Sequence, residues 1–387
     1  MAARRPPNRK ALIRVAAAEL FLERGYHNVS VADVAEALGI TASALYYHYR
    51  NKQELLLWAV RDCLDSVDAL VREAADLEEA LRSLAAFVTR PRSVFAIWER
   101  EARNLDGSER DAIREREFEV VAHLVPLLRT ARPDLGGPEA ELVARAVFGV
   151  LGSRSRHRLS LSRRRDQQLM FRMARAAAHC ELSAADRPAG NGPAASGSGL
   201  RIPRREQLLT AAVRLFDERG YQSVTMADIG EAAGIVASGV YRHFPSKTDL
   251  LVTAVNRGGE RIRASADQAL ARARDPREAL ELLLGAHAAV TSEHRHLDGI
   301  LTNERDQLPE KERTALRRFQ ADYQDVWVQA LGAVLPGREP TELKISIHAV
   351  HAMIYFVVRS RTADQWPDLP RRLTELGMAV LVGSSSP

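Results

Sequence analysis

Two short stretches, residues 39–52 and 234–247, combine hydroxyl, aromatic and basic side chains in an order typical of a short helix. In the first stretch four such side chains have the spacing i, i+3, i+4, i+7, which predicts one shared helix face: Ser43, Tyr46, Tyr47 and Arg50. Leu45 and Tyr49 would then face inward. Hydrogen-bonding groups on one exposed helix face suit the base edges and phosphates of a DNA major groove. The pattern therefore predicts DNA binding by both stretches.

The two stretches belong to a longer internal repeat. An offset of 195 (216 − 21) carries residues 21–26, Phe-Leu-Glu-Arg-Gly-Tyr, onto residues 216–221, Phe-Asp-Glu-Arg-Gly-Tyr. The same offset aligns further identical residues without a gap, among them Tyr46, His48 and Lys52 of the first copy. Identity at this density indicates that one structural unit has been duplicated.

Glycines and capping residues predict how these stretches are positioned. Gly25 and Gly220 follow an amphipathic pattern and lie where a helix needs a left-handed residue to end. Ser30 and Thr225 are candidate N-caps of a second short helix, which would end at the glycine that opens each stretch. A sharp turn between two short helices is the geometry of a helix-turn-helix.

A lysine follows each predicted recognition helix. Residues 51–54 (Asn-Lys-Gln-Glu) and 246–249 (Ser-Lys-Thr-Asp) have the form of capping signals, which places Lys52 and Lys247 at the start of the next helix. Backbone N–H groups and the positive end of the dipole favour a phosphate at such a position. A solvated lysine is the alternative for either residue alone, but its recurrence in both copies favours phosphate contact.

Size and composition limit the class of protein. The 387 residues suffice for two or more domains, with a net charge of +5 and a sequence pI of about 9.4. No apolar run approaches the ~20 residues of a membrane span. Arg4 and Arg5 are not followed by a signal segment, so we expect a soluble, mainly helical, cytoplasmic protein. Cys63 and Cys180 are too few for a disulfide framework.

Residues 9–57 and 204–252 resemble the N-terminal DNA-binding domain of the tetracycline-repressor (TetR) family of bacterial regulators. The resemblance is carried by Glu-Arg-Gly-Tyr, by Ala-Asp-(Val/Ile)-x-Glu-Ala, and by Gly-Ile followed by Tyr-x-His-(Tyr/Phe). It implies an all-α fold with two tandem copies of a helix-turn-helix domain, each followed by a helical ligand-binding and dimerisation domain. It also implies a transcriptional regulator whose repression is relieved by a small-molecule effector.

The resemblance assigns roles by position. The family's groove-facing positions are occupied by Ala42, Ser43, Ala44 and Tyr47 in the first copy, and by Ala237, Ser238, Gly239 and Arg242 in the second. Its phosphate-contacting positions are occupied by Tyr46, His48 and Lys52, and by Tyr241, His243 and Lys247. The two tyrosines among them could instead be core aromatics exposed at one edge. Arg242 can bond a guanine bidentately whereas Tyr47 cannot, so we expect an operator with unequal half-sites.

The patterns divide the chain into a basic arm (1–8), a first helix-turn-helix domain (9–57), a first regulatory domain (58–185), a flexible linker (186–200), a second helix-turn-helix domain (201–253) and a second regulatory domain (254–387). We call the two helix-turn-helix domains the first and second readers. In the family, the last two helices of a regulatory domain pack against a partner, so we expect residues 139–180 and 341–382 to pair within one chain. This intrachain pseudo-dimer would set the readers one DNA turn apart, ~34–36 Å. A dimer of chains with four readers is the alternative.

Seven aromatic and histidine side chains are candidates for lining an effector cavity: Trp98, Phe118 and Phe148 in the first regulatory domain, and Tyr323, Trp327, His351 and Tyr355 in the second. They favour an apolar or amphipathic small molecule, although such residues also serve as ordinary core. His348 and His351, three residues apart, could join other histidines in a metal site, but packing is the simpler interpretation. We therefore expect no metal and no cofactor.

The sequence leaves two other classes of protein as alternatives to a regulator. A DNA-architectural protein would share the readers but bind without sequence preference and without small-molecule control. For an enzyme, the sequence offers no Gly-rich phosphate loop, no zinc-spaced Cys/His set and no G-x-S-x-G nucleophile motif. We therefore expect DNA and a small molecule, and not a substrate undergoing reaction, to be the partners of this chain.

Overall fold

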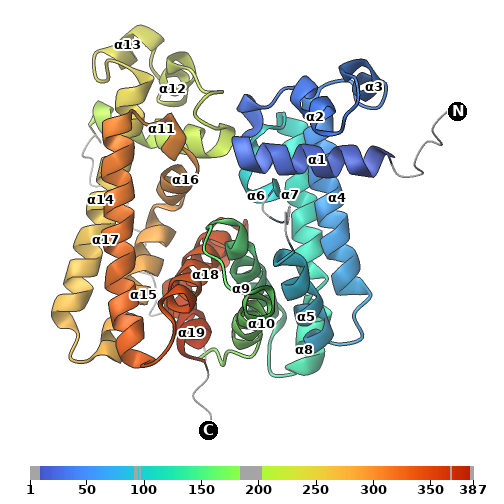
Figure 1. Cartoon of the computed structure of the whole chain (residues 1–387). Helices are drawn as coiled ribbons and strands as arrows, with labels where there is room; N and C mark the ends of the chain where they lie inside the picture. Colours follow the sequence, from blue (N-terminus) through green and yellow to red (C-terminus); the bar gives the residue numbers. More distant parts are fainter. Residues whose placement is uncertain (1–8, 91–94, 96, 184–202, 367, 384–387) are drawn as a thin grey trace, which may run out of the picture. The chain divides into compact units, whose positions relative to one another are not determined.

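The computed structural model describes residues 9–90, 95, 97–183, 203–366 and 368–383. These residues form helices joined by turns, with no strand among them, which confirms the all-α prediction (Figure 1). The chain folds into two compact units, Met1–Ala178 and His179–Pro387. The predicted basic arm (1–8) and linker (186–200) lie outside the described residues.

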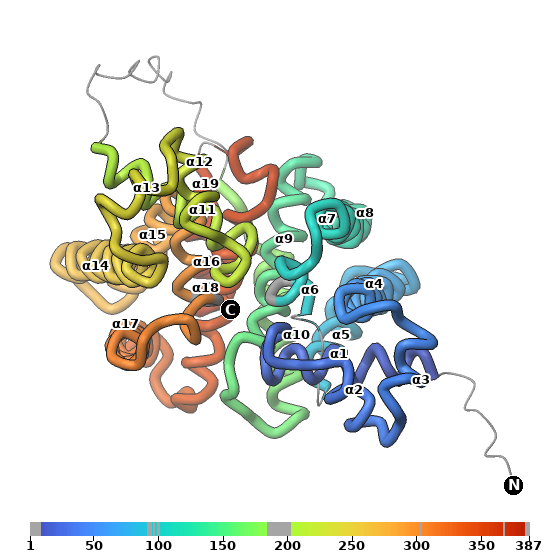
Figure 2. Tube along the Cα trace, turned by 90° about the horizontal axis from the view of Figure 1, so that it is seen from above, coloured from blue at the N-terminus to red at the C-terminus, as the bar shows by residue number. Residues whose placement is uncertain are grey.

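The first unit starts with the helix-turn-helix and continues into regulatory helices. Its α-helices are α1 (Arg9–Arg24), α2 (Val31–Ala37), α3 (Ala42–Tyr46), α4 (Lys52–Arg72), α5 (Leu77–Val88), α6 (Ile97–Arg100), α7 (Gly107–Ala122), α8 (Val125–Ala131), α9 (Gly137–Gly152) and α10 (Arg163–Ala178). Short 3-10 turns occur at η1 (Tyr26–Asn28), η2 (Ala102–Asn104) and η3 (Ser153–Ser155). Helix α1 packs across α4, and α2 and α3 lie together at the N-terminal end of α4 (Figures 1 and 2).

The second unit repeats this order with longer regulatory helices. Its elements are α11 (Arg204–Arg219), α12 (Met226–Ala232), α13 (Ala237–Tyr241), α14 (Lys247–Arg272), α15 (Pro276–Glu293), α16 (Arg295–Asn303), η4 (Arg305–Gln307), α17 (Glu310–Val334), α18 (Pro340–Val358), η5 (Ala363–Gln365) and α19 (Leu369–Val382). Helix α17 runs unbroken, whereas α7 and α8 follow one another in the first unit. Helix α15 packs against α14, α17 and α19, so it lies at the centre of this regulatory domain.

Capping residues start the reader helices where the sequence predicts. Ser30 and Asp33 form a reciprocal capping box at α2, and Thr225 and Asp228 form the same box at α12. At the start of α4, the Asn51 side chain accepts the backbone N–H of residue 54 at 2.7 Å. These side chains satisfy N–H groups that the first turn of a helix leaves without backbone partners, and so fix where each short helix begins.

Positive backbone angles occur at the glycines that separate the reader helices. Gly25 and Gly220 have φ of 81° and 78°, and Gly39 and Gly234 have φ of 63° and 68°. A residue with a Cβ rarely adopts this region, so glycine is required at these turns. The predicted helix ends in both readers are thereby confirmed.

Each reader is continuous with its regulatory domain through one long helix. Helix α4 runs across the predicted domain boundary at 57/58, and α14 runs across the boundary at 253/254.

One described helix, α18, is long and apolar enough to cross a membrane by length and composition. However, 78% of its most apolar window is buried inside the protein. It contacts α15, α16, α17 and α19, all helices of the second unit. Its apolarity is therefore that of a core helix, since a helix that is hydrophobic on all sides must be buried.

Candidate DNA-binding site

The first recognition helix, α3, presents three predicted contact residues to solvent. Thr41 caps the helix by accepting the backbone N–H of Ala44 at 3.2 Å. Leu45 is fully buried, which fixes the rotation of the helix and turns Ser43 and Tyr46 outward. Tyr47, the residue after α3, is the most exposed large apolar side chain of the described chain, with 81% of its surface accessible.

The predicted helical stripe is wrong at its last member, Arg50. Helix α3 ends at Tyr46, so Arg50 is not on its face but in the turn before α4. The backbone N–H of Arg50 donates to the Glu54 carboxylate at 2.6 Å, as part of the cap of α4. Tyr49, four residues after Leu45, is buried as predicted, with only 3% of it exposed.

The second recognition helix, α13, has the same frame and different exposed chemistry. Val240 is buried where Leu45 is buried in the first copy, and Arg242 is exposed where Tyr47 is exposed. The N-cap is Val236, which offers no side-chain oxygen and is 74% exposed. The second reader thus exposes the guanidinium of Arg242 and the apolar side chain of Val236. At the matching positions the first reader has the phenol of Tyr47 and the hydroxyl of Thr41.

The remaining predicted contact residues surround these exposed groups. Ser238, Tyr241 and His243 are exposed, and the others are half-buried: Ala42, Ala44, His48, Lys52, Ala237, Gly239 and Lys247. The His48 ring lies edge-on to that of Tyr47, with 5.4 Å between centroids. The structure therefore gathers the predicted residues of each reader around one helix end.

Lys52 and Lys247 have an intramolecular role that the sequence did not reveal. The Lys52 ammonium donates to the carbonyl oxygens of Tyr26 and Val29 at 2.8 and 2.9 Å, and lies 4.1 Å from the centre of the Tyr26 ring. Lys247 binds Tyr221 and residue 224 with the same two distances, at 4.2 Å from the ring centre. Burial lowers the pKa of both lysines. An ammonium has three N–H donors, and two of them are used by these carbonyl oxygens.

A buried carboxylate of each regulatory domain binds the same loop from the other side. The backbone N–H of Tyr26 donates to the Glu101 carboxylate at 3.2 Å, and that of Tyr221 donates to Glu304 at 3.2 Å. Both glutamates are at least 95% buried. The sequence contained a signal for this pair, because Arg100-Glu-Ala-Arg-Asn-Leu105 aligns with Asn303-Glu-Arg-Asp-Gln-Leu308 at an offset of 203 (304 − 101). Each tyrosine therefore joins the reader to its regulatory domain through its backbone.

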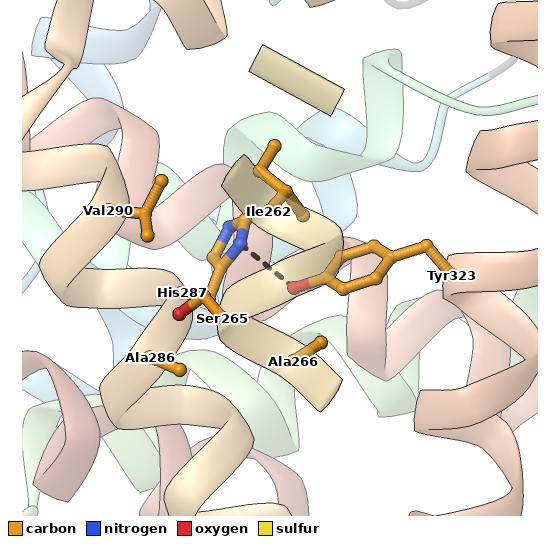
Figure 3. Close-up of a pocket in the computed structure, with 7 residues that line it drawn as sticks. All are labelled: Ile262, Ser265, Ala266, Ala286, His287, Val290 and Tyr323. Carbon is orange, nitrogen blue, oxygen red and sulfur yellow. Dashed lines mark hydrogen bonds between the residues drawn. The ribbon is translucent and has the colours of Figure 1, made fainter. Parts of the chain in front are cut away.

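Of the seven candidate effector residues, one lines the described cavity. Tyr323 and His287 face this narrow cavity between α14, α15 and α17, which has no room for a water molecule, and their side chains are hydrogen-bonded at 3.2 Å (Figure 3). Trp327 and His351 pack behind them, whereas Tyr355 lies against Arg359. Trp98, Phe118 and Phe148 do not contribute to it. Among the described residues no group of three or more His, Cys, Asp or Glu side chains could hold a metal ion.

Comparison with known proteins bears on the readers. A sequence model described as "Bacterial regulatory proteins, tetR family" matches residues 13–58 and 208–254. The chain is 36% identical over 89 residues to the HTH-type transcriptional repressor KstR of Mycolicibacterium smegmatis, covering 23% of this chain and 44% of KstR. It is 29% identical over 149 residues to the repressor KstR2 of Rhodococcus jostii, covering 36% and 70%. It is 35% identical over 103 residues to the transcriptional activator FasR of M. smegmatis, covering 26% and 45%.

The chain thus spans less than half the length of the KstR and FasR proteins it matches. Similar solved structures include a TetR-family transcriptional regulator from Bordetella parapertussis, with a TM-score of 0.44 and 21% identity over 48% of this chain and 97% of that chain. Another is the ketosteroid transcriptional regulator KstR2 of Mycobacterium tuberculosis, with a TM-score of 0.41 and 21% identity over 48% and 96%.

The chain thus has two helix-turn-helix modules of the DNA-binding class, each continuous with a helical domain. Residues 13–58 and 208–254 each match the tetR-family model, so the chain carries two modules of that family in tandem.

Proposed function

We propose that this protein is a cytoplasmic, sequence-specific repressor of transcription that reads an operator with unequal half-sites and is released by a small apolar or amphipathic effector. One observation carries the proposal: two readers share one framework of caps, glycines and lysine contacts, yet expose different side chains at the matching position. The framework is the same in both readers, whereas the exposed Tyr47 of the first reader is matched by Arg242 in the second. Recognition of two different DNA sequences requires this combination.

Base reading is assigned to the exposed side chains of α3, α13 and the residues that follow them. Arg242 has the donors to bind O6 and N7 of a guanine together, and Val236 suits the methyl group of a thymine. Tyr47 offers a single hydroxyl and an apolar ring. The second half-site should therefore contain a guanine at a position where the first half-site does not demand one.

Phosphate contacts are assigned to Tyr46, His48 and Lys52 and to their counterparts Tyr241, His243 and Lys247. These side chains flank the recognition helices, and each lysine retains one donor beyond its two carbonyl contacts. Their identity in both readers fits a role that fixes the register on the duplex, because the phosphate backbone is the same in both half-sites.

We further propose that one chain acts as a pseudo-dimer of its two units. In this pseudo-dimer, α9 and α10 of the first unit correspond to α18 and α19 of the second. Helix α9, apart from its first turn, and helix α18 carry apolar side chains on nearly all sides, so each needs apolar neighbours. A single chain would then carry both readers to one operator, and a second chain would not be needed.

Selection of bound sequences from random DNA by the full chain tests this function. We expect one enriched motif with two unlike half-sites whose centres are about 10 base pairs apart. Arg242→Ala should relax the preference in one half-site only. Binding without an enriched motif would instead identify a DNA-architectural protein, and absence of DNA binding would refute both functions.

A further inference from the structure

The two recognition helices differ in how their N-terminal ends are held. Thr41, the N-cap of α3, accepts the backbone N–H of Ala44 at 3.2 Å. The N-cap of α13 is Val236, whose side chain carries no acceptor atom and is 74% exposed. A side-chain cap satisfies a backbone N–H that the first turn of a helix leaves without a partner. Helix α13 therefore begins without the local support that α3 has.

The backbone hydrogen bonds of the two helices differ in the same direction. In α3, the N–H of Leu45 donates to the carbonyl oxygen of Thr41 at 3.3 Å, and that of Tyr47 donates to Ser43 at 3.2 Å. The offset of 195 places the matching pairs within residues 236–242, which the structure describes, and neither pair forms such a bond there. Because these i→i−4 bonds tie the ends of a five-residue helix to its flanks, α13 is held less firmly than α3.

Two alanines of the first reader are matched by glycines in the second. The offset of 195 aligns Ala35 with Gly230 on α12, and Ala44 with Gly239 on α13. Glycine in a helix is less favourable than alanine, because its unfolded backbone has more freedom to lose. Packing requires Gly230, since a Cβ there would lie 2.8 Å from the carbonyl oxygen of Ile235. A Cβ at Gly239 would lie 3.3 Å from the end of the Ile235 side chain, which can give way slightly. Gly239 therefore weakens α13 at a position where alanine would fit.

The frames around the two recognition helices are otherwise alike. Leu45 and Val240 are both fully buried, and capping boxes begin α2 and α12 in the same way. Lys52 and Lys247 hold the first loop of each reader with equal distances. The differences are thus concentrated in α13 and the turn before it, which position the exposed Arg242.

A short helix with few local bonds is marginally stable, because forming its first turn fixes several backbone angles for a single hydrogen bond. The side-chain cap, the two end bonds and the alanine all favour α3, whereas the described residues of α13 lack all three. When only the ordered form of a helix binds DNA, the dissociation constant rises by the inverse of the ordered fraction. The second reader therefore has an ordering cost that the first does not have, and contacts with DNA must offset it.

We propose that the two readers engage DNA in different ways. Helix α3 is formed before DNA is bound and anchors the chain, whereas α13 completes its hydrogen bonds only on a matching half-site. Val236 and Gly239 are positioning residues, because they act on the placement of Arg242 through the order of α13. The DNA part rests on the proposed function, but the state of each free helix can be tested without DNA.

The chain offers a matched pair of double variants, because each reader can be given the residues of the other. Val236→Thr with Gly239→Ala supplies α13 with the cap oxygen and the alanine of α3. Thr41→Val with Ala44→Gly removes both from α3. All four positions are exposed or half-buried, so neither double variant disturbs the core.

Amide hydrogen exchange of the full chain without DNA tests the state of the two helices. Relative to their intrinsic rates, we expect the N–H groups of Val240 and Arg242 to exchange severalfold faster than those of Leu45 and Tyr47. The double variant of the second reader should slow exchange in α13 by about tenfold, and that of the first should speed exchange in α3 by a similar factor. Equal exchange in both free helices would overturn the proposal, as would exchange that responds to neither double variant.

Binding to duplexes that contain only one half-site tests the consequence for DNA. The double variant of the second reader should bind the second half-site about tenfold tighter with unchanged base preference, and that of the first reader should bind the first half-site more weakly by a similar factor. A changed base preference at unchanged affinity would show that Val236 and Gly239 read bases, and would refute their ordering role. Failure of the unaltered chain to bind any specific DNA would refute the proposed function, and the exchange rates of the free helices would then decide the state of α13.

Discussion

The ammonium of Lys52 binds the carbonyl oxygen of Tyr26 at 2.8 Å, and Lys247 binds Tyr221 at the same distance in the second copy. This contact holds the loop between the first two reader helices against the start of α4 or α14. The same tyrosines receive a regulatory carboxylate on their backbone N–H. The loop is therefore held from both sides. The lysine stabilises this loop in the absence of DNA.

Replacing Lys52 or Lys247 with Met should destabilise the corresponding reader by about 1–3 kcal/mol, because two charge-assisted hydrogen bonds are lost while the apolar stem is kept. Urea unfolding checks the stability. If the third N–H also binds phosphate, each substitution should reduce the slope of log Kd against log salt by about one. An unchanged slope would mean that the lysine is structural only.

Exchanging the exposed residue between the readers should exchange sequence preference. Tyr47→Arg should introduce a guanine preference of about 1–3 kcal/mol into the first half-site, as expected for a bidentate contact. Arg242→Ala should remove that preference from the second. Affinities for operators altered at single base pairs give the measurement. A uniform loss at all sequences would show that Arg242 contacts phosphate and not a base.

Weakening the carboxylate contact should loosen the loop without unfolding the unit. Glu101→Gln and Glu304→Gln keep an acceptor oxygen but remove its charge, so the bond to the tyrosine N–H weakens. We expect faster hydrogen exchange at Tyr26 or Tyr221 and severalfold weaker DNA binding by that reader. Glu73→Gln, at the exposed end of α4, is the control. If exchange at the tyrosine amide were unchanged, the glutamates would not position the loop.

Acidification should destabilise the second unit. Burial lowers the pKa of His287 and His348 to about 4, whereas an unfolded histidine titrates near 6.5. Between these values the unfolded chain binds protons that the folded chain does not, so the free energy of unfolding falls as pH drops from about 6.5 to 4. The slope is at most about 1.4 kcal/mol per pH unit for each histidine. Hydrogen exchange of α15 and α18 against pH measures it, and His348→Gln should reduce the slope.

Light scattering at micromolar concentration should report the mass of one chain, 42.9 kDa, in the absence of DNA. One chain should then bind one operator, since both readers are present in it. A stable species of two chains without DNA would contradict the pseudo-dimer and favour the four-reader alternative.

The sequence by itself determined the reader frames. The glycines with positive φ, the Ser30 and Thr225 caps, and the burial of Leu45 and Tyr49 follow from local backbone chemistry and helix periodicity, which act over a few residues. It failed at Arg50, because α3 ends at Tyr46 and the backbone of Arg50 instead joins the cap of α4. Periodicity alone cannot say where a helix stops.

Only the tertiary structure decided how readers and regulatory domains are joined. The contacts of Glu101 and Glu304 connect atoms 75 and 83 residues apart, and the similarity of the residues around the two glutamates does not reveal that they bind Tyr26 and Tyr221. Hydrogen bonds and buried ion pairs depend on distance in space, so the folded chain was needed to reveal them.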